Sequence, residues 1–137
     1  MKRYLGSCHC GKVQFEIQTQ IENLRVCNCS VCHKRGALIT RVEEKQFTLL
    51  SSWDELTVYQ WGSLTAKDYF CKSCGILPFR KSSALTNKEK LAGKRAFLGW
   101  SINARCLKDF EPDSVEILCI NGRGLELSNA IDDSPAF

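Results

Sequence analysis

The chain has 137 residues, a net charge of +4 and an apolar fraction of 44%, values typical of one compact domain, and we predict a single domain over residues 1–137. No run of about 18 consecutive apolar residues occurs, so no membrane-spanning helix is predicted. Basic residues exceed acidic ones in residues 1–106. Nucleic-acid binding is not expected, because no known binding motif accompanies this positive charge.

The N-terminus has two basic residues with no apolar stretch behind them, so a secretory signal is not predicted. We therefore expect a cytoplasmic protein in a reducing compartment. In that setting, closely spaced cysteines indicate metal or redox chemistry in preference to disulfides. The sequence contains nine cysteines, and we interpret them first as metal ligands.

Short apolar segments separated by Gly, Ser, Asn and Asp recur along the chain. Val13, Phe15 and Ile17 alternate with polar residues, which is the pattern of a half-buried strand. Residues 82–92, which end at Gly93, could form a helix or an irregular loop. Many short strands with turns between them predict an all-β fold. The predicted strands cover residues 13–17, 24–26, 37–42, 47–50, 56–59, 69–71, 76–79, 96–102 and 115–120.

Seven of the nine cysteines are clustered along the sequence. Cys71-Lys72-Ser73-Cys74-Gly75 has the C-x-x-C-G pattern of a zinc knuckle, in which both sulfurs face one metal and backbone N–H groups point at the sulfurs. Structural zinc takes four ligands, whereas catalytic zinc usually has three protein ligands and one open position. The clusters are Cys8 with Cys10, then Cys27 with Cys29 and Cys32, then Cys71 with Cys74.

These seven cysteines divide as four plus three. The middle cluster is contiguous enough to share one metal, although its spacing alone does not establish this. The first and last clusters would then form a closed structural site that joins the N-terminal strand to the middle of the chain. We expect two zinc ions per chain, and the open three-cysteine site can be empty or partly filled. Iron is an alternative metal for the C-x-x-C pattern.

Two cysteines and two histidines lie outside this division. Cys119 stands between apolar neighbours and is interpreted as a small buried side chain, and Cys106 is interpreted in the same way. His9 and His33 are adjacent to cysteines of the clusters. Either imidazole could bind zinc, but we expect both to lie near the metal without binding it or to face solvent.

The segments GSCHCGKVQFE, CNCSVCHKRGA and FCKSCGILPF resemble the glutathione-dependent formaldehyde-activating (GFA) family, also described as the CENP-V/GFA domain. The family pattern is C-x-C-G, then C-x-C-x-x-C, then C-x-x-C-G, and all seven cysteines are present in order. The resemblance implies an Mss4-like, tent-like fold of several small antiparallel sheets. It also implies the same partition, with Cys8, Cys10, Cys71 and Cys74 at a structural zinc and Cys27, Cys29 and Cys32 at the active-site zinc.

Members of this family are assigned a carbon–sulfur lyase activity that joins glutathione and formaldehyde as S-hydroxymethylglutathione. The resemblance therefore implies a glutathione-like thiol and an aldehyde as substrates at the open site. Lys34, Arg35 and Arg80 are candidates to meet the carboxylates of such a thiol, or are solvated surface charges. Two alternatives stay open: a non-catalytic zinc protein that carries a thiol or its adduct, and an interaction module with structural zinc only.

Overall fold

The structure is a computed structural model that describes residues 1–62, 64–82, 87–95 and 97–123. Strands make up most of the regular secondary structure of the described residues, which also contain two short α-helices, so the all-β fold class is confirmed. None of the helices in this part of the chain has the length and apolar character of a membrane span. The strands are β1 (Lys2–Ser7), β2 (Gln14–Thr19), β3 (Asn23–Cys27), β4 (Ile39–Glu43), β5 (Phe47–Leu49), β6 (Leu56–Tyr59), β7 (Lys67–Cys71), β8 (Phe79–Lys81), β9 (Gly99–Asn103) and β10 (Glu116–Ile120), and the helices are α1 (Ser30–Arg35) and α2 (Asn87–Leu91).

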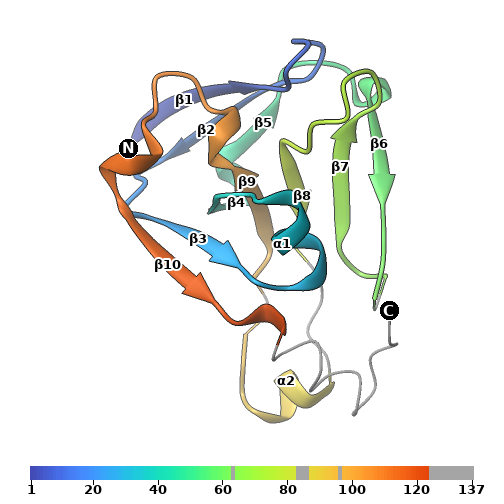
Figure 1. The fold of residues 1–137 in the computed structure, drawn as a ribbon, viewed down its shortest axis with the longest axis vertical. Coiled ribbons are helices and arrows are strands. Elements are labelled where there is room, and N and C mark those ends of the chain that lie inside the picture. The colour runs from blue at the N-terminus through green and yellow to red at the C-terminus, as the bar shows by residue number, and fades with distance from the viewer. Residues whose placement is uncertain (63, 83–86, 96, 124–137) are drawn as a thin grey trace.

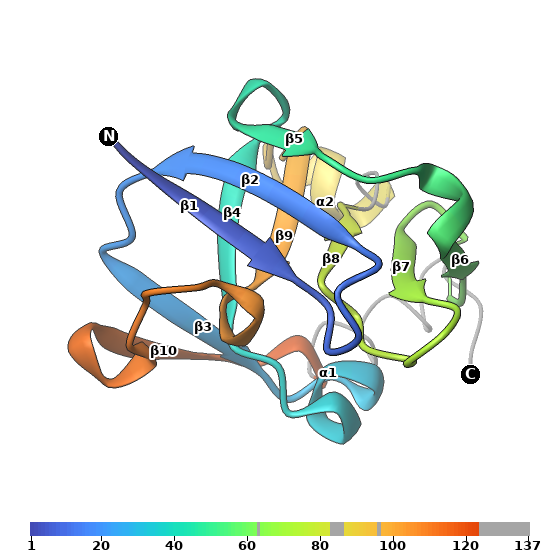
Figure 2. The same ribbon diagram turned by 90° about the horizontal axis from the view of Figure 1, so that it is seen from above.

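The strands form two sheets. A small sheet has the order β1-β2-β5, and a larger sheet has the order β10-β3-β4-β9-β8-β7-β6. Neighbouring strands are antiparallel, as expected, except that β10 runs parallel to β3. The view from above shows β1 and β2 crossing the face of the larger sheet over β4, β9 and β8 (Figure 2). This crossing buries an apolar layer between the sheets.

The core lies in that layer. Val13, Phe15 and Ile17 are fully buried, as their alternation with polar residues predicts. From the larger sheet, Phe79 is also fully buried, and its ring lies 5.4 Å from that of Phe15 in an edge-to-face arrangement. Such aromatic pairs add to the free energy of burial and fix how the two sheets face each other. The small sheet is thereby held at a set position over β8 and β9.

Most predicted strands are present, with shifted ends. The prediction for residues 76–79 is largely wrong, because β8 begins at Phe79 and the preceding residues connect it to β7. Pro78 has no N–H to donate to a neighbouring strand, which explains why pairing starts after it. Strand β1 and helix α1 were not predicted. Helix α2 lies inside the predicted segment 82–92, of which residues 83–86 fall outside the described part of the chain, as does residue 96 of the predicted strand 96–102.

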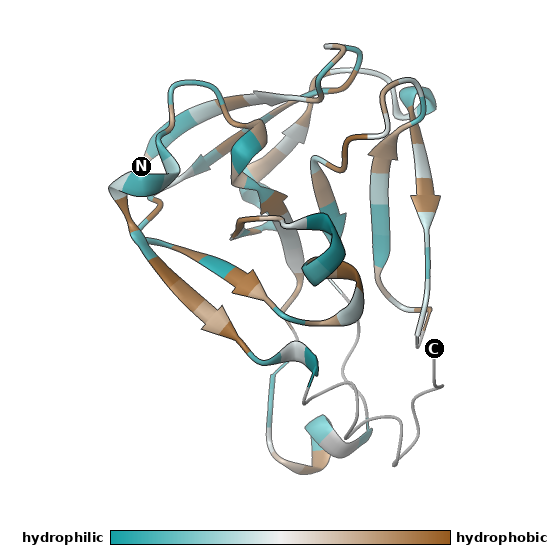
Figure 3. Ribbon diagram, in the orientation of Figure 1, coloured by the Kyte–Doolittle hydropathy of each residue, from teal (hydrophilic) through white to brown (hydrophobic). Residues whose placement is uncertain are grey.

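Strand β10 is the edge of the larger sheet and lies beside β3 at the left of Figure 1. It is mostly apolar (Figure 3), which is why the sequence favoured burial of Cys119. That prediction is wrong, because Cys119 is exposed. Alternate residues of a strand face opposite sides, and on β10 the partly buried side chains are Leu118 and Ile120. Cys119 therefore points away from the core.

Candidate metal centres

The first cysteine cluster joins two distant connections. Cys8 and Cys10 lie between β1 and β2, whereas Cys71 ends β7 and Cys74 lies in the turn after it. The four sulfurs lie within 4.8 Å of one another. The Sγ atom of Cys10 is 3.6 Å from those of Cys8 and Cys71. This is too long for a disulfide and close to the separation of about 3.8 Å that a tetrahedron with Zn–S bonds of about 2.3 Å requires.

Backbone N–H groups point at these sulfurs, as the knuckle pattern predicts. The N–H of Val13 donates to Sγ of Cys8 at 3.3 Å, and that of Cys74 donates to Sγ of Cys71 at 3.4 Å. Gly75 has a φ of +79°, and its N–H donates to the carbonyl of Cys71 at 2.8 Å. Such a positive φ favours glycine. The glycine therefore lets the turn close, so that Cys71 and Cys74 face the same centre.

The second cluster sits at the start of α1. Cys27 is the last residue of β3, Cys29 is the N-cap residue of α1, and Cys32 lies in its first turn. Their sulfurs also lie within 4.8 Å of one another. The N–H of Cys32 donates to Sγ of Cys29 at 3.4 Å, a contact in which sulfur replaces the oxygen of the usual N-cap side chains. Helix formation and the position of two sulfurs are therefore coupled.

The chain after β10 covers this second cluster. The Nδ2 group of Asn28 donates to Oδ1 of Asn121 at 3.1 Å, and the backbone N–H of Arg123 donates to Oδ1 of Asn28 at 2.8 Å. Between them, the backbone of Gly122 lies against the sulfur of Cys27 and helps to lower the pKa of that thiol. A residue almost one hundred positions away therefore contacts the cluster. Gly122 could not be identified from the sequence, because no local pattern connects it to the cysteines.

The crowding of sulfurs changes their protonation. The pKa of Cys27 is lowered to about 2, chiefly because the thiols of Cys29 and Cys32 donate to its sulfur. The same contacts raise the pKa of Cys32. In the first cluster, burial acts to raise the pKa of Cys74, but backbone N–H groups from Ile76 and Cys10 outweigh it and hold the pKa at about 6. Thiolates that accept hydrogen bonds in this way are the form that binds metal.

The donor chemistry of both clusters fits a thiophilic cation. Thiolate ligands select zinc, copper(I) or iron–sulfur clusters over magnesium and calcium. Among the described residues, neither His9 nor His33 belongs to either group of potential ligands, and both are exposed. The structure therefore offers one four-sulfur group and one three-sulfur group, the partition that the sequence predicts. Two metal ions can be held, and zinc is consistent with both groups.

A pocket of about 280 Å³ borders the three-cysteine cluster. Cys27 and Cys32 reach it from β3 and α1, and Cys119 reaches it from β10. The cluster is thus open to a space that small molecules can enter. The complete lining is Val26, Cys27, Asn28, Cys32, His33, Gly36, Cys119, Ile120 and Asn121.

Cys106 lies near the other cluster. It is partly buried and packs against the core, which agrees in part with the prediction of a small buried side chain. Burial raises its pKa to about 11, and the negative charges of Cys8 and Cys74 add to this effect. Among the described residues, Cys106 is not a member of either group of potential ligands.

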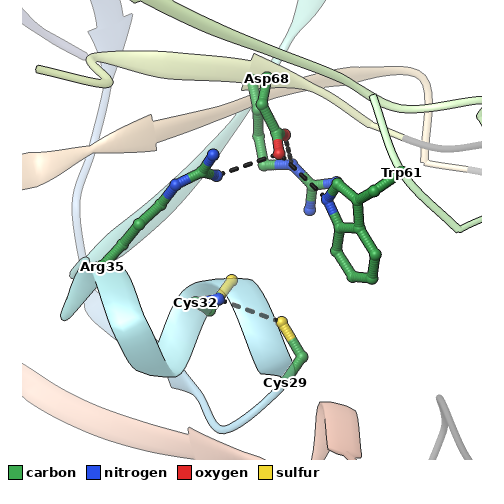
Figure 4. Close-up of polar contacts among 6 residues, drawn as sticks. Cys29, Cys32, Arg35, Trp61 and Asp68 are labelled. Carbon is green, nitrogen blue, oxygen red and sulfur yellow. Dashed lines mark hydrogen bonds and ion pairs between the residues drawn. The ribbon is translucent and has the colours of Figure 1, made fainter. Parts of the chain in front are cut away.

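Charged side chains meet beside α1. Asp68 on β7 is 1% exposed and accepts hydrogen bonds from Arg35 at 3.0 Å, from Arg80 at 2.7 Å and from the indole N–H of Trp61 at 3.2 Å. Figure 4 shows Arg35 and Cys32 on α1 and Cys29 at the start of that helix, with Asp68 and Trp61 facing it. Of the predicted basic candidates, Arg35 and Arg80 are brought together and Lys34 stays exposed. Asp68 and Trp61 were not identified from the sequence.

The fold and the two sulfur groups define a small β-rich protein with two candidate metal centres. Residues 3–96 match the family described as "Glutathione-dependent formaldehyde-activating enzyme", and the chain belongs to that family. The structure is also similar to the crystal structure of a Rhodobacter sphaeroides protein, a Northeast Structural Genomics target, with a TM-score of 0.67 and 27% sequence identity over 83% of this chain and 99% of that chain.

Proposed function

We propose that the protein is a carbon–sulfur lyase that joins a glutathione-like thiol with formaldehyde or a related aldehyde at the three-cysteine cluster. The observation that carries the proposal is the contrast between the two clusters. In the described part of the chain, one group has four candidate ligands and the other has three beside a pocket. Four thiolates complete a tetrahedral structural zinc site, whereas three leave a position for another ligand.

In this proposal Cys8, Cys10, Cys71 and Cys74 hold a structural zinc ion, and Cys27, Cys29 and Cys32 hold a second one. The second ion would supply a binding position for the substrate thiol and favour its thiolate form at neutral pH. The family's printed description, which names glutathione and formaldehyde, supports this choice of substrates. A reducing, cytoplasmic location would keep all the ligands in the thiol form.

The bond-forming step needs no oxidant or reductant. The thiolate sulfur forms a bond to the carbonyl carbon of the aldehyde, and the π electron pair of the C=O bond moves to oxygen. The proton that the thiol released ends on that oxygen. The product is a hemithioacetal, which for formaldehyde is the S-hydroxymethyl adduct of the thiol. The chain's own part is to hold three sulfurs in place, donate N–H groups to two of them from Cys29 and Cys32, and border the pocket.

The test is catalytic turnover by the zinc-loaded protein. Exchange NMR measures the rate at which glutathione and formaldehyde interconvert with their adduct, which also forms without a catalyst. We expect wild type to accelerate this rate at substoichiometric concentration and Cys29→Ser to lose the acceleration. Cys106→Ser is the matched control, since among the described residues Cys106 belongs to neither cluster and does not line the pocket. If the protein binds the adduct but turns over no more than one equivalent, it is a carrier.

A further inference from the structure

Strand β10 forms one edge of the larger sheet and, in the described residues, has a neighbouring strand on one side alone. That neighbour is β3, and Figure 1 shows β10 at the left margin of the fold. Natural edge strands are usually protected from further pairing by lysine, by proline or by short length. Among the edges of the small sheet, β1 begins with Lys2 and Arg3, and β5 has three residues. Strand β10 has five residues, of which all but Glu116 are apolar, and Ile117 is 43% exposed.

The backbone groups at the outer side of β10 belong to Ile117 and Cys119. The N–H of Asn28 donates to the carbonyl of Ile120 at 3.1 Å, so the peptide groups of Ile120 face β3. Peptide groups of successive residues in a strand point to opposite sides in the plane of the sheet. Those of Ile117 and Cys119 therefore point outward, where the described part of the chain places no strand. Such a row of N–H and C=O groups is a template for another strand.

The charges at the two ends of β10 favour an antiparallel partner with the same sequence. Glu111, Asp113 and Glu116 lie before or at the start of the strand and are exposed, whereas Arg123, which follows its end, is exposed and basic. A second copy in parallel would bring acidic groups together, but an antiparallel copy brings the acidic start of each strand toward Arg123 of the other. The opposite edge strand, β6, is followed by no basic residue before β7. Charge complementarity therefore distinguishes β10 from β6.

We propose that β10 pairs with β10 of a second copy of this chain, antiparallel and centred on Leu118, so that the two larger sheets become one. Ile117 of each copy then lies opposite Cys119 of the other, and each such pair exchanges backbone hydrogen bonds. The arrangement is a two-fold symmetric dimer. Cys119 and Ile120 also line the pocket beside the three-cysteine cluster, so the second copy lies next to that pocket. The dimer does not depend on the proposed activity.

Sedimentation equilibrium of the full zinc-loaded chain measures the dissociation constant of the dimer. A pair of short strands is a small interface, so we expect a reversible dimer. Ile117→Lys should raise the dissociation constant at least about tenfold, because it places an ammonium group at the apolar contact in both copies. Val58→Lys on β6 is the matched control, since Val58 is also 43% exposed on an edge strand, and its effect should be less than about twofold.

A charge reversal tests the direction of pairing. Arg123→Glu should weaken the dimer, and Asp113→Lys added to it in the same chain should recover part of the loss, because opposite charges face each other again. Zinc content and circular dichroism identify the folded variants. A wild type that is monomeric at every concentration, or a dimer that Ile117→Lys does not weaken, would overturn the proposal.

Hydrogen exchange tests the wild type without any substitution. The amide of Cys119 points outward, so it should exchange slowly in concentrated protein and quickly on dilution. The amide of Leu118 points toward β3 and should stay protected at both concentrations. Protection of Cys119 that does not change with concentration would mean that another segment of the same chain covers the edge, and the dimer would be overturned.

Discussion

Gly122 lies against the sulfur of Cys27 so closely that a side chain cannot fit between them. A Cβ atom on Gly122 would be 2.4 Å from Sγ of Cys27 and 3.0 Å from Cβ of Cys29. The backbone of Gly122 also helps to lower the pKa of this thiol. The absence of a side chain therefore allows the chain after β10 to close over the three-cysteine cluster.

Gly122→Ala should displace either the segment after β10 or the Cys27 sulfur, because the added methyl group would overlap that sulfur. We expect zinc content to fall from two ions per chain to one, with the four-cysteine cluster still filled. Native mass spectrometry measures the change. Arg123→Ala is the neighbouring control, since the contact of Arg123 with Asn28 is made by its backbone N–H and survives the substitution. A Gly122→Ala protein that keeps both ions would contradict the close approach.

Asp68→Asn should destabilise the fold, because it leaves Arg35 and Arg80 without their shared carboxylate. Removing one partner of a buried ion pair costs about 3–5 kcal/mol, and the partial exposure of the arginines lowers our expectation to about 2–3 kcal/mol. Urea denaturation measures the free energy of unfolding. Glu16→Gln, which breaks the more exposed pair with Arg3, should have a smaller effect. Equal effects of the two substitutions would mean that Asp68 is not a buried anchor.

Phe79→Ala should be the most damaging single core truncation. The ring is fully buried and lies 4.8 Å from that of Phe47 and 5.4 Å from those of Phe15 and Trp100. Loss of a buried phenylalanine ring costs about 3–5 kcal/mol. Thermal unfolding followed by circular dichroism measures the decrease in stability. Leu98→Ala is the control, because Leu98 is 74% exposed, and a comparable loss there would contradict the placement of the core.

Local patterns in the sequence predicted much of the fold. Alternation around Phe15 and the knuckle ending at Gly75 each depend on residues a few positions apart, and both are present in the structure. Helix α1 was not predicted because it has six residues and a cysteine as its N-cap residue, and neither feature is typical of a predicted helix. The exposure of Cys119 depends on which strand lies at the sheet edge, which local apolar character does not reveal.

The surroundings of the clusters could not be predicted, since they depend on contacts between distant segments. Asp68 meets Arg35 because β7 and α1 are brought together by the order of strands in the larger sheet. Gly122 reaches Cys27 because β10 pairs with β3 in parallel. A parallel pairing across more than ninety residues leaves no local pattern in the sequence. The cysteines were identifiable, but the residues that position them were not.

Metal stoichiometry tests the central claim, that seven cysteines form one closed and one open metal centre. Native mass spectrometry counts zinc ions in wild type, Cys29→Ser and Cys74→Ser prepared under reducing conditions with zinc supplied. We predict two ions in wild type, one ion in a folded Cys29→Ser, and misfolding of Cys74→Ser, because a structural zinc site contributes directly to folding. If Cys29→Ser misfolds while Cys74→Ser stays folded with one ion, the assignment of the two centres is contradicted.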